Sequence, residues 1–268
     1  MRPTLTPLQR NNISTRGSSE DAIVFAHGFG CDQNMWRFVA PAFEDRFKTV
    51  LFDNVGAGNS DLSAYSFDKY ASLHGYADDL IEIVQDLNLS NPVFVGHSVS
   101  AMVGLLAQKK SPGLFRSLIL VGPSPCYIND DGYVGGFTRE QLEELLESLE
   151  DNHLGWSASM APAIMGNAER PELGEELSAS FCRTDPDIAA HFARVTFMSD
   201  HRSDLGSTGV PTLILQCSSD VIAPPEVGEF MRRQIPGSTL VNMQATGHCP
   251  NLSAPQETVS LIREFLSV

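Results

Sequence analysis

The sequence predicts an α/β fold in which a mostly parallel central sheet is flanked by helices and carries an inserted group of four helices. Three observations support this prediction. Short apolar segments rich in β-branched residues recur along the chain, amphipathic helical segments lie between most of them, and this alternation stops between residues 131 and 204. Alternating strands and helices are typical of a parallel sheet, because each parallel strand needs a crossover to the next. The length of 268 residues suits one large domain with an appendage.

Six segments are predicted to be strands buried on both faces, since each is almost continuously apolar. They are Ala22–Ala26, Thr49–Phe52, Pro92–Val95, Ser117–Val121, Pro211–Leu215 and Thr239–Met243. Helices are predicted between most of these strands. Examples are Tyr76–Leu87, and Val259–Leu266 after the helix-starting Pro255.

The interruption of this alternation contains helical patterns only. Thr138 and Gln141 form a capping box, and Leu142, Leu145, Leu146 and Leu149 follow with the spacing of one helix face. Three further helices are predicted over Gly155–Met165, Pro171–Phe181 and Pro186–Phe197. We therefore expect residues 1–130 to form the first part of a core, 131–204 a four-helix cap, and 205–268 the second part of the core.

Composition and charge narrow the range of partners. The net charge is −15, which would repel a nucleic-acid backbone or an anionic membrane surface. No apolar run reaches the roughly 18 residues that span a bilayer, and residues 1–19 lack the apolar centre of a secretion signal. We expect a soluble, cytoplasmic protein that binds neither nucleic acid nor membranes. The five cysteines are scattered without a CxxC spacing, so no disulfide framework and no metal site is predicted.

The strongest chemical signal is the segment Val93–Met102, in which Ser98 stands between an apolar strand and a helix of small residues. A sharp strand-to-helix turn of this kind lifts a serine hydroxyl above the sheet, and Gly96 lets the turn close tightly. The sequence departs from the G-x-S-x-G pattern, because Ser100 stands at the second glycine position. We interpret Ser98 as a nucleophile, and the alternative is an ordinary strand-to-helix turn.

A serine nucleophile needs a base, and the base needs an orienting acid. Asp220 and His248 each follow the end of a predicted strand downstream of Ser98. Because the carboxyl ends of parallel strands gather at one edge, we predict a Ser98, Asp220, His248 catalytic triad there. Taken singly, Asp220 could be a turn-forming residue and His248 an ordinary loop histidine. His97 is expected only to pack beside the turn.

Stabilising an oxyanion requires N–H donors that are already in place. The glycine-flanked turn at residues 27–30 frees backbone amides, and Val99 begins the helix after the predicted nucleophile. We predict that the amides of Phe29 and Val99 form the oxyanion hole. An apolar substrate pocket between cap and sheet is predicted to be lined by Phe137, Trp156, Met160 and Phe197. The alternative is that each of these four is plain core.

With these residues placed, the chain resembles the α/β-hydrolases along its whole length, and in particular the RsbQ-like subfamily of bacterial stress regulators. The motifs that carry the resemblance are residues 27–33, 53–58, 96–101, 122–127 and 199–202. They are also similar to those of the plant karrikin and strigolactone receptors, which share the Ser100 feature. The resemblance implies the α/β-hydrolase fold with a four-helix cap, the Ser98, Asp220, His248 triad, and slow hydrolysis of a small hydrophobic ester.

We therefore predict a serine carboxylesterase that works without a cofactor on a small hydrophobic ester or lactone-like ligand. The alternative is a signalling hydrolase that binds or slowly hydrolyses such a ligand and then engages a partner protein. A PAS-domain phosphatase is the partner implied by the resemblance alone. A carbon–carbon bond hydrolase with the same triad is a minor alternative.

Overall fold

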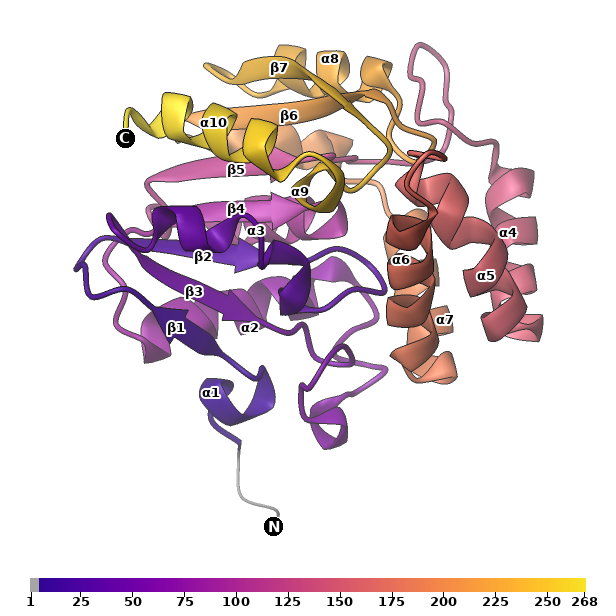
Figure 1. Ribbon diagram of the computed structural model, residues 1–268, viewed down its shortest axis with the longest axis horizontal. Helices are drawn as coiled ribbons and strands as arrows, with labels where there is room; N and C mark the ends of the chain where they lie inside the picture. Colours follow the sequence, from indigo (N-terminus) through magenta and orange to yellow (C-terminus); the bar gives the residue numbers. More distant parts are fainter. Residues whose placement is uncertain (1–4) are drawn as a thin grey trace.

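The computed structural model describes residues 5–268, and its centre is a seven-stranded sheet with the order β1-β3-β2-β4-β5-β6-β7 (Figure 1). Strand β1 pairs with β3 in antiparallel fashion, and every other pair is parallel. The mostly parallel sheet is thus confirmed, with all six predicted strands present. The strands are β1 Ser14–Arg16, β2 Ala22–Ala26, β3 Lys48–Phe52, β4 Val93–His97, β5 Ser117–Val121, β6 Thr212–Ser219 and β7 Thr239–Thr246.

The edge strand β1 was not predicted from the sequence. All three of its residues are exposed, so it carries no apolar pattern that would mark a strand. Strands β6 and β7 also continue beyond their predicted ends, through mostly polar residues. Strand β7 is the other edge of the sheet and most of its residues are exposed or half-buried, so the prediction that it is buried on both faces is wrong. Polar residues at strand ends give no hydrophobic signal, yet these extensions carry the chain toward the edge where polar side chains gather.

Helices cover both faces of the sheet (Figure 1). Side chains alternate between the faces along each strand, so Val93 and Val95 of β4 belong to one core cluster and Phe94 to the other. Helices α2, α3 and α8 pack on the Phe94 face, and α10 with the short helices η1 and η2 on the opposite face. The helices outside the insertion are α1 Pro7–Arg10, η1 Gln33–Trp36, η2 Ala40–Phe43, η3 Leu62–Ala64, α2 Leu73–Asp86, α3 Val99–Lys110, η4 Arg202–Ser207, α8 Pro225–Gln234, α9 Pro250–Ser253 and α10 Pro255–Leu266. None of the helices within residues 5–268 has the length and apolarity to cross a membrane.

Four α-helices between β5 and β6 lie beyond the carboxyl ends of the parallel strands (Figure 1). They are α4 Arg139–Asp151, α5 His153–Met165, α6 Pro171–Arg183 and α7 Pro186–Phe197. Helix α5 packs on α6, and α4 packs on α7. The predicted capping box of Thr138 and Gln141 is formed at the start of α4. Helix α5 begins two residues before the predicted start, because the Asn152 side chain accepts a hydrogen bond from Gly155 N and caps it.

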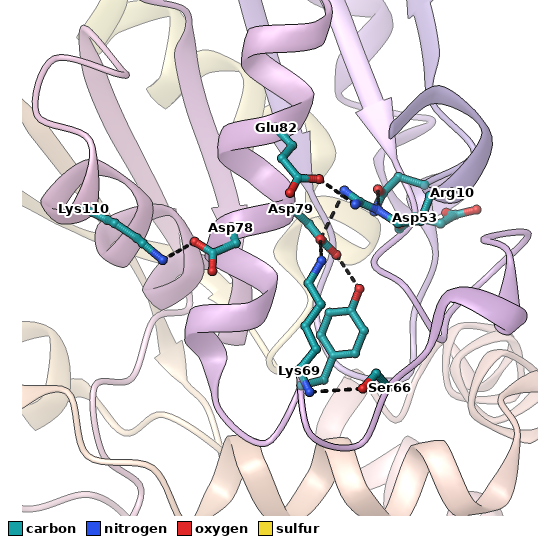
Figure 2. Close-up of polar contacts among 10 residues, drawn as sticks. Arg10, Asp53, Ser66, Lys69, Asp78, Asp79, Glu82 and Lys110 are labelled. Carbon is teal, nitrogen blue, oxygen red and sulfur yellow. Dashed lines mark hydrogen bonds and ion pairs between the residues drawn. The ribbon is translucent and has the colours of Figure 1, made fainter. Parts of the chain in front are cut away.

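A cluster of charged side chains around the buried Asp79 joins the N-terminal segment to helix α2 (Figure 2). The guanidinium of Arg10 lies 2.6 Å from a carboxylate oxygen of Glu82 and 3.1 Å from one of Asp79. Asp79 also accepts hydrogen bonds from Lys69 Nζ at 2.5 Å and from the Tyr70 hydroxyl at 2.7 Å. Burial raises the pKa of Asp79, and the charge of Arg10 and the contact with Lys69 act against that rise. The cluster therefore holds a buried carboxylate by surrounding it with donors.

Candidate active site

Ser98 occupies a strained turn between β4 and α3. Its backbone has φ 54° and ψ −124°, a conformation that residues other than glycine rarely adopt. A Cβ atom at Gly96 would lie 2.6 Å from the carbonyl oxygen of Ser100, so this position of the turn accepts only glycine. The predicted sharp strand-to-helix turn is therefore present. It carries Ser98 past the carboxyl end of β4, to the edge of the sheet that the four inserted helices face.

The structure brings Ser98, His248 and Asp220 into one chain of hydrogen bonds. His248 Nε2 lies 2.7 Å from Ser98 Oγ, and His248 Nδ1 lies 2.7 Å from Asp220 Oδ2. Because a carboxylate only accepts, Nδ1 carries the proton and Nε2 accepts from the serine hydroxyl. The second carboxylate oxygen of Asp220 accepts from the amides of Ile222 at 2.8 Å and Ala223 at 3.2 Å. The imidazole thus has the tautomer and orientation that a general base for Ser98 requires.

His97 does more than pack beside the turn, which corrects the expectation from the sequence. Its Nε2 donates a hydrogen bond to the backbone carbonyl of His248 at 2.8 Å. Burial, and then the neighbouring His248, lower the pKa of His97 to about 3, so the ring is neutral at ordinary pH. Its Nδ1 is buried without a hydrogen-bond partner among residues 5–268. No sequence signal distinguishes such a histidine from a packing residue, because its partner is a main-chain oxygen far along the chain.

The two predicted oxyanion donors lie beside Ser98. Val99 is the first residue of α3, and the amides of a helix's first turn have no acceptor within the helix. Phe29 lies in the turn that follows β2 and lines the same cavity as Ser98. A Cβ atom at Gly28 would lie 2.5 Å from His97 Nδ1 and 3.2 Å from Ser98 Cβ, so this turn runs directly against the one that carries Ser98.

A small, mostly apolar cavity of about 30 Å³ adjoins Ser98 and His248. The inserted helices contribute Ile164, Leu177, Phe181, Thr196 and Phe197 to its wall. The sheet side contributes Phe29, Cys31, His97, Tyr127, Ile222 and Cys249. A volume of this size has room for only about one or two water molecules. The cavity therefore fits a small apolar group, and a larger ligand enters only when cap side chains move.

Of the four residues predicted to line the pocket, the structure places only Phe197 there. Trp156 stands behind the wall, with its ring centroid 5.6 Å from that of Phe181. Met160 lies one turn before Ile164 on α5, and only the Ile164 end of this helix reaches the site. There the carbonyl oxygen of Ile164 accepts a hydrogen bond from His248 N at 2.8 Å. Phe137 packs partly buried against the core, and its amide donates to the carbonyl of Tyr127.

Tyr127 lines the cavity although the sequence analysis assigned it no role. Its ring is almost fully buried and packs 5.0 Å from the ring of Phe197, centroid to centroid. Burial raises the pKa of the Tyr127 hydroxyl well above its ordinary value, while the nearby Ser98 hydroxyl acts against that rise. The phenol is therefore protonated at ordinary pH. The sequence feature that could have indicated a role for Tyr127 is its place in the segment 122–127, one of the motifs on which the family resemblance rests.

The arrangement brings together a serine hydroxyl, a hydrogen-bonded imidazole and a carboxylate that orients the imidazole, next to the first turn of α3, whose amides have no acceptor within the helix. Within residues 5–268, no three His, Cys, Asp or Glu side chains are grouped so that they could hold a metal ion. A serine hydroxyl paired with an imidazole in this way is suited to nucleophilic attack on a carbonyl carbon.

This fold and site define the class of the protein. The chain matches the model of the Alpha/beta hydrolase family over residues 23–261 and therefore belongs to that family. It is 38% identical over 260 residues to a strigolactone esterase of Arabidopsis thaliana, covering 97% of each chain. It is 36% identical over 255 residues to a karrikin insensitive 2 receptor of Petunia hybrida, covering 95% and 94%.

A solved structure of a hydrolase from Oleispira antarctica is also similar, with a TM-score of 0.95 and 44% identity over 97% of this chain and 96% of the other. The predicted similarity to α/β-hydrolases and to the plant karrikin and strigolactone proteins is thus confirmed.

Proposed function

We propose that the protein is a serine carboxylesterase that cleaves a small hydrophobic ester or lactone. One observation carries the proposal: a continuous hydrogen-bond chain from Asp220 through His248 to Ser98, which ends at an apolar cavity. The similarity to a strigolactone esterase supports an ester or lactone as the substrate class. The proposed reaction proceeds through a covalent acyl-enzyme and needs no cofactor.

In the first half of the proposed reaction, Ser98 Oγ attacks the carbonyl carbon while His248 Nε2 accepts the hydroxyl proton. Asp220 stabilises the imidazolium that forms, and the amides of Phe29 and Val99 donate to the oxyanion. The carbon–oxygen bond to the alcohol then breaks, and His248 returns its proton to the departing oxygen. The acyl group stays on Ser98.

In the second half, water replaces the alcohol. His248 takes a proton from the water, the resulting hydroxide attacks the acyl carbon, and the bond to Ser98 Oγ breaks as His248 returns the proton to the serine. The carboxylic acid leaves through the cap. Because the cavity holds only about 30 Å³, a large substrate requires the cap side chains that line it to move, and we expect small acyl groups to be preferred.

The test is hydrolysis of p-nitrophenyl acetate by the wild-type protein and by Ser98→Ala. We expect the variant to lose nearly all turnover and to keep its fold, because alanine fits the turn but offers no nucleophile. Ser157→Ala is the matched control, since it removes the hydroxyl of a different buried serine, one that donates to the carbonyl of His153 in α5. Turnover by Ser98→Ala equal to that of the wild type would overturn the proposal.

A second candidate function is favoured by the similarity to karrikin insensitive 2 receptors together with the small size of the cavity. Here the same site binds or slowly hydrolyses a small hydrophobic ligand, and the altered cap then engages a partner protein. The RsbQ-like resemblance implies a PAS-domain phosphatase as that partner. A ligand shifts the cap only if it prefers one arrangement, so partner binding must depend on ligand. Fast multiple turnover with no ligand-dependent partner would leave the esterase alone.

A further inference from the structure

Three polar side chains are buried together beneath the turn that carries Phe29. They are His27 at the end of β2, Asn54 after β3, and Ser100 in the first turn of α3, with exposed fractions of 0%, 4% and 0%. None of the three lines the cavity beside Ser98 in the described part of the chain. Buried polar groups of this kind are expected to hold something in place, because leaving them unpaired would be costly.

Ser100 connects the two turns of the site. Its hydroxyl donates to the carbonyl oxygen of His27 at 2.5 Å. The side-chain amide of Asn54 donates to the same carbonyl at 3.3 Å and to Ser100 Oγ at 3.4 Å. The first carbonyl of the turn at residues 27–30 is therefore tied to helix α3, immediately after the predicted donor Val99. A glycine at position 100, as in the G-x-S-x-G pattern, has no group that could make this bond.

The ring of His27 holds the next carbonyl. The backbone N–H of Asn54 can only donate, so His27 Nε2, 2.9 Å away, accepts and carries no proton. The proton is then on Nδ1, which donates to the carbonyl oxygen of Gly28 at 2.9 Å. The amide of Cys31 donates to that oxygen as well, at 3.3 Å. Both carbonyls that precede Phe29 are thus fixed by donors from inside the protein.

The direction of the Phe29 N–H follows from these bonds. A trans peptide is planar, with its C=O and N–H pointing in opposite directions. The structure contains no cis peptide among the described residues. Holding the oxygen of Gly28 against the His27 ring therefore turns the N–H of Phe29 to the opposite side of the peptide and prevents the peptide from rotating.

We propose that Ser100 is a positioning residue that couples the turn of Ser98 to the turn of Phe29 and so holds the two oxyanion donors in fixed relation. This inference rests on the proposed function, since it assigns a task to a residue that supports the same site. Ser100 reaches the reacting atoms only through the backbone of His27 and Gly28. Its effect should therefore fall on the transition state and leave ground-state binding unchanged.

The experiment compares wild type, Ser100→Ala and Ser100→Gly, using p-nitrophenyl acetate as substrate and phenylboronic acid as a probe that forms a tetrahedral adduct with serine. Glycine restores the usual pattern of the turn, so this variant keeps its fold. Thr212→Val is the matched control: it removes a buried hydroxyl that donates to the carbonyl of Val210, at the opposite end of the sheet. Complete loss of an oxyanion donor lowers kcat by roughly 100- to 1,000-fold.

Because Asn54 still donates to the His27 carbonyl, we expect both Ser100 variants to lower kcat by about 10-fold, with KM and the pH profile unchanged. The affinity for phenylboronic acid should fall by the same factor, while Thr212→Val keeps the wild-type kcat and affinity. A wild-type kcat in Ser100→Ala, or an equal loss of kcat in Thr212→Val, would overturn the inference. The proposed function would still stand in that case, as long as turnover depends on Ser98. Turnover that does not need Ser98 would remove the proposed function and this inference together.

Discussion

Two carboxylates are buried in this protein, and different groups surround them. Asp79 on α2 and Asp220 after β6 have side chains that are only 3% and 0% exposed. Around Asp79 the partners are the cations of Arg10 and Lys69 and the hydroxyl of Tyr70, as Figure 2 shows for the two cations. The partners of Asp220 are two backbone amides and the ring of His248.

The difference lies in where each network ends. From Asp79, the contacts lead through Arg10 to Glu82, a half-exposed carboxylate, and through Lys69 to the surface. From Asp220, the contacts lead through His248 to a serine hydroxyl that faces a cavity. Burial raises the pKa of Asp79, so a perturbed acid by itself does not mark a site of chemistry in this protein. A reactive group at the open end of the network is what distinguishes the two regions.

The largest expected effect breaks the second network. Asp220→Asn should lower kcat for p-nitrophenyl acetate by roughly 10,000-fold, because the amide can donate to His248 Nδ1 and so favours the wrong tautomer of the ring. Steady-state kinetics on the purified variant measure this. A loss of less than about tenfold would show that His248 does not depend on Asp220 for its orientation.

The matching substitution in the Asp79 network should lower the stability of the fold and leave the rate of catalysis unchanged. Asp79→Asn leaves Arg10 and Lys69 without their shared carboxylate, so we expect the free energy of unfolding to fall by on the order of 3 kcal/mol. Urea denaturation measures the loss, and kcat at a temperature where the variant is folded should equal that of wild type. A large fall in kcat of the folded variant would contradict the separation of the two regions.

His97 gives a pH-dependent test of the region around His248. The pKa of His97 is lowered from 6.5 to about 3, so between these values the unfolded chain binds a proton that the folded protein does not. Stability is therefore lost as pH falls through this window, at up to about 1.4 kcal/mol per pH unit from this residue. Its contribution is absent in His97→Gln, whose free energy of unfolding should fall less steeply than that of wild type between pH 6 and pH 4. Parallel slopes would mean that His97 is not held neutral.

The smallest expected effect concerns the cavity wall. Phe197→Ala should raise kcat/KM for p-nitrophenyl butyrate relative to acetate by several-fold, since each methylene group that gains an apolar site contributes about 0.8 kcal/mol. Met160→Ala is the matched control, because Met160 lies on the cap without lining the cavity. Equal changes of the butyrate-to-acetate ratio in the two variants would indicate that Phe197 does not determine the preference for acyl-chain length.

The sequence allowed the sheet and the three polar residues to be predicted for one physical reason. Each of the six predicted parallel strands has a short apolar run in the sequence, and Ser98, Asp220 and His248 each follow the end of such a run. The residues of the cavity wall were harder to predict from the sequence, because they depend on how far each cap helix reaches over the sheet. Ile164 lines the cavity and Met160, one turn before it on the same helix, does not, although both are apolar.

The role of His97 and the Ser100 bond to His27 also escaped sequence reasoning. Both depend on main-chain oxygen atoms of distant residues, and a backbone carbonyl leaves no trace in residue types.

The most direct test of the central claim is covalent labelling with a p-nitrophenyl alkylphosphonate, which transfers a phosphonyl group to an activated serine and releases p-nitrophenolate. Intact mass and peptide mapping report the site. We predict one phosphonyl group per chain, on Ser98, with Asp79→Asn labelled at the wild-type rate and Asp220→Asn labelled far more slowly. Labelling at another residue, or equal rates in Asp220→Asn and wild type, would contradict the account.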